Sequence, residues 1–312
     1  MKKYFPILFA FIILGIVAFL LFFKKNQVSS LSSISQDPLN IGIFQKEKSC
    51  AIAPKFLKDM HIPSPYLIDL SQKKYRGIAL YYGKGLHNVL HAKQWEEYGH
   101  FSTYSVDKKG NIYLAPMPFI SIEKKTFMRQ KSIYRLSSRT GIVTPFMTLD
   151  DIVPNKNNPY GISAIAYDCS DESLWVAAID ETDYRHEKGV IYHIDIKQKR
   201  VLNKIEGFDA LSLTLMQSSK GKYLLAGSAR DSGLYAFAIL NHSIQLPAMP
   251  LLKLPDATQH IRKIRVSNTN TLMLESIEFN YSLIVQTTRE DRMVTYATWE
   301  EEGEKWKMQL KQ

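Results

Sequence analysis

One stretch decides the fold: GISAIAYDCSDESLWVAAIDETDYRHEKGVIYHIDIKQKRVLNKIE, residues 161–206. It contains four short apolar or alternating runs separated by polar turns, namely Ile162–Tyr167, Leu174–Ile179, Val190–Ile196 and Val201–Ile205. Short β-rich runs at close spacing are typical of an antiparallel meander. A four-stranded meander of about 45 residues has the size of one β-propeller blade.

The same unit recurs along the chain. Its second strands are centred on Tyr113, Trp175, Tyr223 and Met273, at intervals of 62, 48 and 50 residues. The third strands repeat an aromatic residue in IYRL (133–136), IYHI (191–194) and LYAF (234–237). In the last unit we predict Tyr281–Gln286 as the third strand and Met293–Trp299 as the fourth. Four strands in the same order in four consecutive units favour a propeller over unrelated hairpins, which are the alternative.

A shorter unit precedes these four. It has one strand fewer than a full blade, with runs at Tyr66–Ser71, Arg76–Tyr82 and Leu86–Ala92. A ring of sheets must close, because an open end leaves unpaired backbone groups. We therefore predict that the last alternating run, Lys305–Leu310, completes this first blade. Residues 64–312 then form an all-β propeller of five four-stranded blades, or six if Ile41–Phe56 supplies further strands.

The N-terminus has the pattern of a membrane anchor. Tyr4–Phe23 is uncharged and lies between MKK and two further lysines. Twenty helical residues span roughly the 30 Å hydrocarbon core of a bilayer. The alternative is a cleaved signal peptide, whose apolar run is shorter and precedes a small-residue site that this sequence lacks. We predict one transmembrane helix in residues 1–25, a linker in residues 26–63, and a propeller on the extracytoplasmic side of the cell membrane.

Composition and motifs exclude several functions. The chain has 312 residues and a net charge of +10, but its basic residues are scattered among acids, which argues against a nucleic-acid partner. No G-x-S-x-G, H-E-x-x-H or Walker A motif is present. Only two cysteines occur, Cys50 and Cys169. They either form one disulfide that joins the linker to the propeller or remain free.

Two segments resemble a known superfamily. DKKGNIYLA (107–115) resembles the turn and strand D-x-x-G-N-x-Y-V-A of NHL-type and gluconolactonase-like propellers, and residues 160–195 resemble their repeated blade unit. The resemblance implies a divalent metal bound at the channel mouth by Glu, Asn and Asp. Asp209 matches the family Asp, but Tyr160 stands where the family has Asn. The Glu that the family carries in its first blade has no counterpart near Tyr66. The resemblance therefore supports the fold and not the metal site.

The blade geometry predicts which residues surround the mouth of the central channel. One set precedes the innermost strands: His100, Tyr160, Asp209 and His260. A second set comes from loops between second and third strands: Asp180, Asp183, Arg185, His186, Arg230, Asp231, Glu278 and Asn280. These residues either bind a divalent cation such as calcium or lie in water, and we favour water because charged side chains are mostly exposed. We accordingly expect no cofactor, and only a small loss of stability on Asp209→Ala.

Two functions from different classes remain. The first is a membrane-anchored extracytoplasmic binding module whose loop face takes a protein, a glycan or a small ligand. The second is a metal-dependent hydrolase of the lactonase or esterase type, with Asp209 and the loop acids as ligands. The first needs only the architecture and the anchor, so it is the prediction, and whether the chain is an enzyme stays open.

Overall fold

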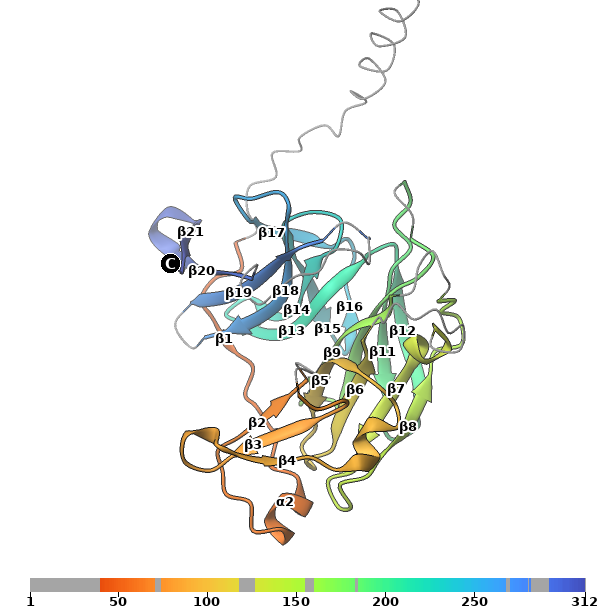
Figure 1. The fold of residues 1–312 in the computed structure, drawn as a ribbon. Coiled ribbons are helices and arrows are strands. Elements are labelled where there is room, and N and C mark those ends of the chain that lie inside the picture. The colour runs from red at the N-terminus through yellow and green to blue at the C-terminus, as the bar shows by residue number, and fades with distance from the viewer. Residues whose placement is uncertain are drawn as a thin grey trace, which may run out of the picture. The chain divides into compact units, whose positions relative to one another are not determined.

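The computed structural model describes residues 40–70, 74–117, 127–154, 160–182, 185–267, 270–279, 281 and 292–311. These form five antiparallel sheets, so the predicted five-bladed all-β propeller is confirmed (Figure 1). They belong to one compact unit, Pro38–Gln312. The predicted transmembrane helix lies outside the described residues, among which no helix is long and apolar enough to cross a membrane.

The blades follow one another in chain order. Blade 1 contains β2 (Tyr66–Asp69), β3 (Ala79–Tyr82) and β4 (Asn88–Leu90). Blade 2 contains β5 (Phe101–Val106), β6 (Ile112–Pro116), β7 (Ser132–Leu136) and β8 (Val143–Thr148). Blade 3 contains β9 (Gly161–Asp168), β10 (Ser173–Ile179), β11 (Val190–Asp195) and β12 (Arg200–Glu206).

The last two blades are the most elaborate. Blade 4 contains β13 (Ala210–Ser218), β14 (Gly221–Ser228), β15 (Gly233–Leu240), β16 (Ser243–Ile244) and β17 (Met249–Lys253), and both short strands pair with β15. Blade 5 contains β18 (Gln259–Val266), β19 (Thr271–Glu278), β20 (Met293–Glu300) and β21 (Lys305–Leu310). Blade 1 thus has only three strands and blade 4 more than four, which corrects the prediction of uniform four-stranded blades.

Apolar cores join successive blades. Every residue of β10 is buried, because this second strand is covered on both faces by neighbouring blades. Separate clusters of buried side chains join blades 1 and 2, 2 and 3, 3 and 4, and 4 and 5. Among the described residues, no such cluster joins blade 5 to blade 1. The ring is therefore closed there by other means.

The end of the chain differs from the prediction. β20 holds the third place in blade 5, and residues 282–286 of the predicted third strand lie outside the described residues. The predicted closure by Lys305–Leu310 is wrong, because β21 pairs with β20 through a short turn at Glu301–Gly303. Trp306 packs on Trp299, with ring centroids 5.3 Å apart. The alternating strand therefore finds its partner locally.

An N-terminal segment, residues 40–57, crosses the ends of the inner strands; we term it the strap. Its strand β1 (Phe44–Lys46) pairs with β13, so it extends blade 4 and does not start a sixth blade. Downstream it ends in the short helix α2 (Lys55–Asp59). Figure 1 shows it running from the region of β20 and β21, past β1, to α2.

The strap contacts one blade after another. Its Phe44 N–H donates to Asn270 Oδ1 of blade 5 at 2.7 Å, and Glu47 pairs with Lys222 of blade 4 at 2.8 Å. Cys50 forms a disulfide with Cys169 of blade 3, with the two Cα atoms 5.9 Å apart. Phe56 N–H donates to Ser138 O of blade 2 at 2.8 Å, and the Phe56 ring lies in the core shared by blades 1 and 2. The strap thus takes over the closing role predicted for β21.

Candidate functional site

The inner strands of all five blades enclose a central channel. Together with the strap they line a cavity of about 830 Å³. Residues of the inner strands that carry hydroxyl groups belong to its lining: Ser102, Thr103, Ser105, Ser212 and Thr214. The sequence predicted the binding surface at the loop face, whereas this cavity is lined by the inner strands and the strap.

The described channel lining is strongly basic. It contains six cationic side chains: Lys46, Lys48, Arg262, Lys263, Arg265 and Arg292. Against them stand three carboxylates: Glu47, Asp69 and Glu275. Glu47 is paired with Lys222, which lies outside this lining. Glu275 is shared by Arg265 Nη2 at 3.4 Å and Lys263 Nζ at 3.8 Å. The cavity therefore carries an excess of positive charge.

A β-bulge recurs at one place in each full blade. The register of the inner strand shifts there, and one residue is left without a partner on the second strand: Ser102 in β5, Ser163 in β9, Leu211 in β13 and Arg262 in β18. Bulges re-aim side chains and are frequent beside active sites. Here the four extra residues lie at equivalent points of the segments FSTY, ISAI, ALSL and IRKI.

Hydrogen bonds connect these bulges across the ring. Arg262 Nη1 donates to Leu211 O at 3.1 Å, and its Nη2 is 3.5 Å from Ser102 O. Ser163 Oγ donates to Ala210 O at 2.5 Å. Burial lowers the pKa of Arg262, and the nearby charge of Arg292 adds to this effect. A guanidinium keeps its proton even so, which places a permanent cation among three blades.

Asp209 lies at the mouth end of the channel, but it is not exposed to solvent. It is 0% exposed, and its two oxygens accept hydrogen bonds from Thr182 Oγ1 at 2.8 Å and Tyr281 OH at 2.6 Å. Burial raises its pKa, while these two donors oppose the rise. The prediction that Asp209 lies in water is wrong, because the residues that cover it come from distant loops. Its own N–H donates to Glu187, a carboxylate that the sequence analysis did not single out.

Aromatic side chains close the mouth. Tyr160 packs edge-on against Phe279 and Tyr281, with ring centroids 5.4 and 6.4 Å away. His260 contacts Phe279 at 5.9 Å, and the Arg230 guanidinium lies 5.1 Å from the centroid of the Tyr281 ring. The structure thus gathers Tyr160, Arg230 and His260 near Asp209, and Tyr160 belongs to an apolar cluster with Ile179, Leu211 and Ala229.

Asp231 and Asp180, also predicted at the mouth, have partners of their own. Asp231 accepts from Gly233 N and Tyr235 OH, both at 2.9 Å, and pairs with Lys253. Asp180 accepts from Val153 N at 2.9 Å. The remaining predicted residues are placed as follows: His100 is half-buried, Arg185, His186 and Glu278 are exposed, and Asp183 and Asn280 lie outside the described residues. In the described part of the chain, no three His, Cys, Asp or Glu side chains form a group suited to a metal ion.

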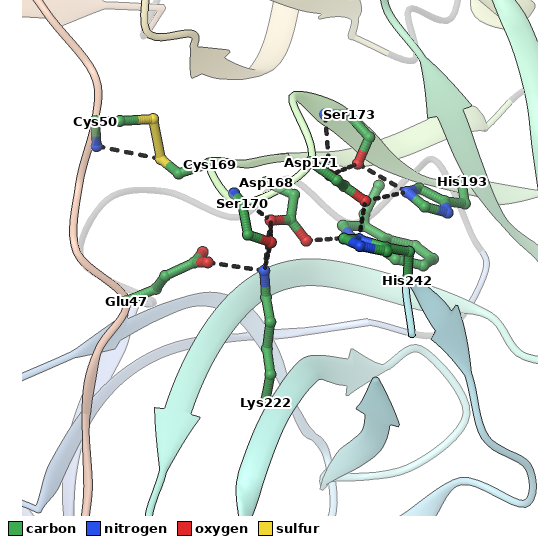
Figure 2. A network of polar contacts seen from close by, with 11 residues as sticks. Glu47, Cys50, Asp168, Cys169, Ser170, Asp171, Ser173, His193, Lys222 and His242 are labelled. Carbon is green, nitrogen blue, oxygen red and sulfur yellow. Dashed lines mark hydrogen bonds and ion pairs between the residues drawn. A yellow bond between two sulfur atoms is a disulfide. The ribbon is translucent and has the colours of Figure 1, made fainter. Parts of the chain in front are cut away.

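A polar network lies at the opposite end of the channel, next to the strap (Figure 2). His193 Nε2 is 2.7 Å from Ser173 Oγ and 3.1 Å from Asp171 Oδ2. A catalytic Ser-His-Asp triad uses one ring nitrogen for the serine and the other for the carboxylate. Here both partners meet the same nitrogen, so this cluster holds the fold. Burial would raise the pKa of Asp171, but hydrogen bonds from His193 and Ser173 outweigh it and lower the pKa to about 2.

The same network fastens blade 3 to blade 4 and to the strap. Lys222 of β14 binds Asp168 of blade 3 and Glu47 of the strap, as Figure 2 shows. His242, from the turn between β15 and β16, reaches Asp171 at 3.3 Å. The Cys50–Cys169 disulfide lies on the strap beside these contacts.

Comparisons with known proteins leave the activity open. No protein-family model matches the chain, and no curated protein matches it. A protein of unknown function from Bacteroides caccae is 12% identical, with a TM-score of 0.42 over 77% of this chain and 85% of that one. Two glucose dehydrogenase structures are 14% and 13% identical, each with a TM-score of 0.40, covering 72% and 74% of this chain and 76% and 79% of theirs. Similarity this low carries no argument about function, and the resemblance to NHL and gluconolactonase-like propellers stays a prediction beyond the propeller fold.

Proposed function

We propose that this chain is a binding module whose ligand occupies the central channel. The observation that supports it is the cavity of about 830 Å³, lined by the inner strands of all five blades. Small-molecule sites are typically concave and about 300–1,000 Å³ in volume. The hydroxyl and cationic side chains of its lining suit hydrogen bonding to a polar ligand.

The alternative function is a metal-dependent hydrolase of the lactonase or esterase type. It needs carboxylates at the mouth that are available to a metal and to substrate. Both oxygens of the buried Asp209 instead accept hydrogen bonds from the protein beside an aromatic cluster, and Asp231 is held by Tyr235 and Lys253. This commitment of the carboxylates to internal donors favours the binding module.

The proposal is tested by filling the channel with a large side chain. Thr103→Trp places a large side chain on the channel lining, whereas the matched control Thr144→Trp lies on the exposed face of β8. A panel of sugars, sugar acids and sugar phosphates is screened by thermal shift, and ligands that bind are measured by calorimetry. We expect binding to be lost in Thr103→Trp and kept in Thr144→Trp. Equal binding by both variants, or no ligand for the wild type, would contradict the proposal.

We further propose that Tyr4–Phe23 anchors the module in the cell membrane, with the propeller on the extracytoplasmic side. The support is the uncharged run of twenty residues flanked by lysines. After alkaline carbonate extraction, the full chain should stay with the membranes and a chain without residues 1–25 should be released. Release of the full chain, or a mature N-terminus mapped beyond Phe23, argues against the anchor.

A further inference from the structure

We propose that the channel ligand is a small organic anion that carries phosphate or carboxylate groups, with Arg262 as its anchoring cation. This inference rests on the proposed binding function and names the ligand class for that site. It draws on three features of the channel: its charge, the position of Arg262, and the hydroxyl groups around it.

The charge of the lining is the first feature. Six cations and three carboxylates surround the cavity in the described part of the chain, and Lys222 pairs with one of those carboxylates. A cleft lined by one sign of charge concentrates ions of the opposite sign. Burial also lowers the pKa of Lys263, an effect that Glu275 opposes and that the neighbouring guanidinium groups of Arg265, Arg292 and Arg262 increase. An anion in the channel relieves this repulsion.

The position of Arg262 is the second feature. The bulge in β18 adds this residue to the strand, and its guanidinium reaches carbonyls of blades 2 and 4. Carbonyl oxygens orient the guanidinium without neutralising its charge. An arginine that is already ordered loses little entropy on binding, and its planar group can donate two parallel hydrogen bonds to phosphate or carboxylate.

The hydroxyl groups are the third feature. Ser105 and Thr214 project from β5 and β13 on the same lining as the cations. Hydroxyls both donate and accept, so they match the hydroxyl groups of a sugar or hydroxy acid. The cavity volume of about 830 Å³ accommodates a ligand of that size.

The test compares three ligands that share one sugar ring. Glucose 6-phosphate, glucuronate and neutral glucose are titrated calorimetrically into the wild-type protein and its variants. We expect at least one anion to bind about tenfold or more tightly than glucose, which corresponds to about 1.4 kcal/mol. Tighter binding of glucose 6-phosphate assigns the site to phosphate, and tighter binding of glucuronate assigns it to carboxylate. Equal affinity for glucose, or no binding of either anion, overturns the ligand class.

Substitutions then locate the charge. Arg262→Met should weaken binding of the anion about tenfold or more, since a charge-assisted pair is lost, while glucose is unaffected. The matched control Arg200→Met lies on the exposed outer strand β12 and should change nothing. Arg262 also contacts two backbone carbonyls, so its substitution removes structural contacts as well as charge. Arg265→Met therefore provides a second variant, at a side chain that is 57% exposed. If both variants bind the anion like the wild type, the proposal fails.

The two proposals fail in different ways. If a neutral sugar binds the wild type and Arg262→Met equally but does not bind Thr103→Trp, the channel is the binding site and only the anionic ligand class is contradicted. If an anion still binds Thr103→Trp, the channel is not the binding site and the proposed function is contradicted.

Discussion

The two ends of the central channel are closed by different kinds of chemistry. At the mouth, an aromatic cluster of Tyr160, Phe279 and Tyr281 covers the buried carboxylate of Asp209. At the other end, the strap is held by the Glu47–Lys222 ion pair, by hydrogen bonds from its backbone and by one disulfide. The first closure is aromatic, whereas the second adds an ion pair and a covalent bond to the burial of Phe44 and Phe56.

This difference shows how a propeller can close without sharing a strand between its first and last blades. The described residues contain no apolar core between blade 5 and blade 1, yet the strap contacts blade 5 through Asn270 and enters the core of blades 1 and 2 through Phe56. A segment outside the blades supplies the connection. The strapped end should therefore respond to reductant, which leaves the aromatic end unchanged.

The largest expected effect comes from removing the disulfide. Cys50 and Cys169 are 119 residues apart, so their link closes a long loop in the unfolded chain. The double variant Cys50→Ser with Cys169→Ser should lose about 2–5 kcal/mol of unfolding free energy, measured by denaturant titration. Reductant should destabilise the wild type to the same level and leave the double variant unchanged. A wild type insensitive to reductant would contradict this role.

The next effect concerns the mouth. Asp209→Ala leaves the hydroxyls of Thr182 and Tyr281 without their acceptor in a buried site. We expect a loss of about 3 kcal/mol in unfolding free energy, because each buried donor without a partner costs about 1–3 kcal/mol. The control Asp150→Ala, at a side chain that is 88% exposed, should stay within about 0.5 kcal/mol. Equal behaviour of the two variants would mean that the mouth is open to water.

The smallest effects concern pH, and they have opposite signs at the two ends. At the strapped end, the pKa of Asp171 is lowered from 3.8 to about 2, so its stabilisation is present above pH 4 and is lost as pH falls towards 2. At the mouth, burial raises the pKa of Glu187 from 4.5 to about 7, despite a hydrogen bond from the Asp209 backbone. The folded state therefore favours protonated Glu187, and stability falls as pH rises from 4.5 to 7.

Two neutral variants separate these contributions in unfolding curves measured against pH. Asp171→Asn should flatten the acid limb, and Glu187→Gln should flatten the decline between pH 4.5 and 7. A Glu187→Gln variant that retains the full decline would assign that decline to other groups.

Local pattern was sufficient to predict the strands. The four runs in residues 161–206 correspond to β9, β10, β11 and β12 within two residues at each end. The pairing of β21 was missed because an alternating run shows that a strand has two unlike faces and does not show its partner. In the structure a turn of three residues determines that partner.

The channel chemistry was harder to predict. Asp209 was placed correctly at the start of an inner strand, but its burial depends on Tyr281, 72 residues further along the chain. Arg262 was missed, although the residues at equivalent points of FSTY, ISAI and ALSL are uncharged and make the arginine of IRKI an exception. The alignment of these four segments could have identified Arg262 from the sequence. The bulge that positions its side chain follows from strand pairing, which the sequence pattern does not show.

The strap also has a consequence for the order in which the protein is made. Its residues leave the ribosome before any blade, yet Phe44 binds Asn270, which is synthesised 226 residues later. Contacts so distant in sequence form slowly, and a nascent chain is exposed to misassembly until they do. During synthesis, residues 44–46 must wait until β13 of blade 4 has been made, and Phe44 then gains its last hydrogen bond only when Asn270 of blade 5 appears. A chain truncated before β13 therefore keeps an undocked N-terminal segment, and one truncated before Asn270 lacks that hydrogen bond.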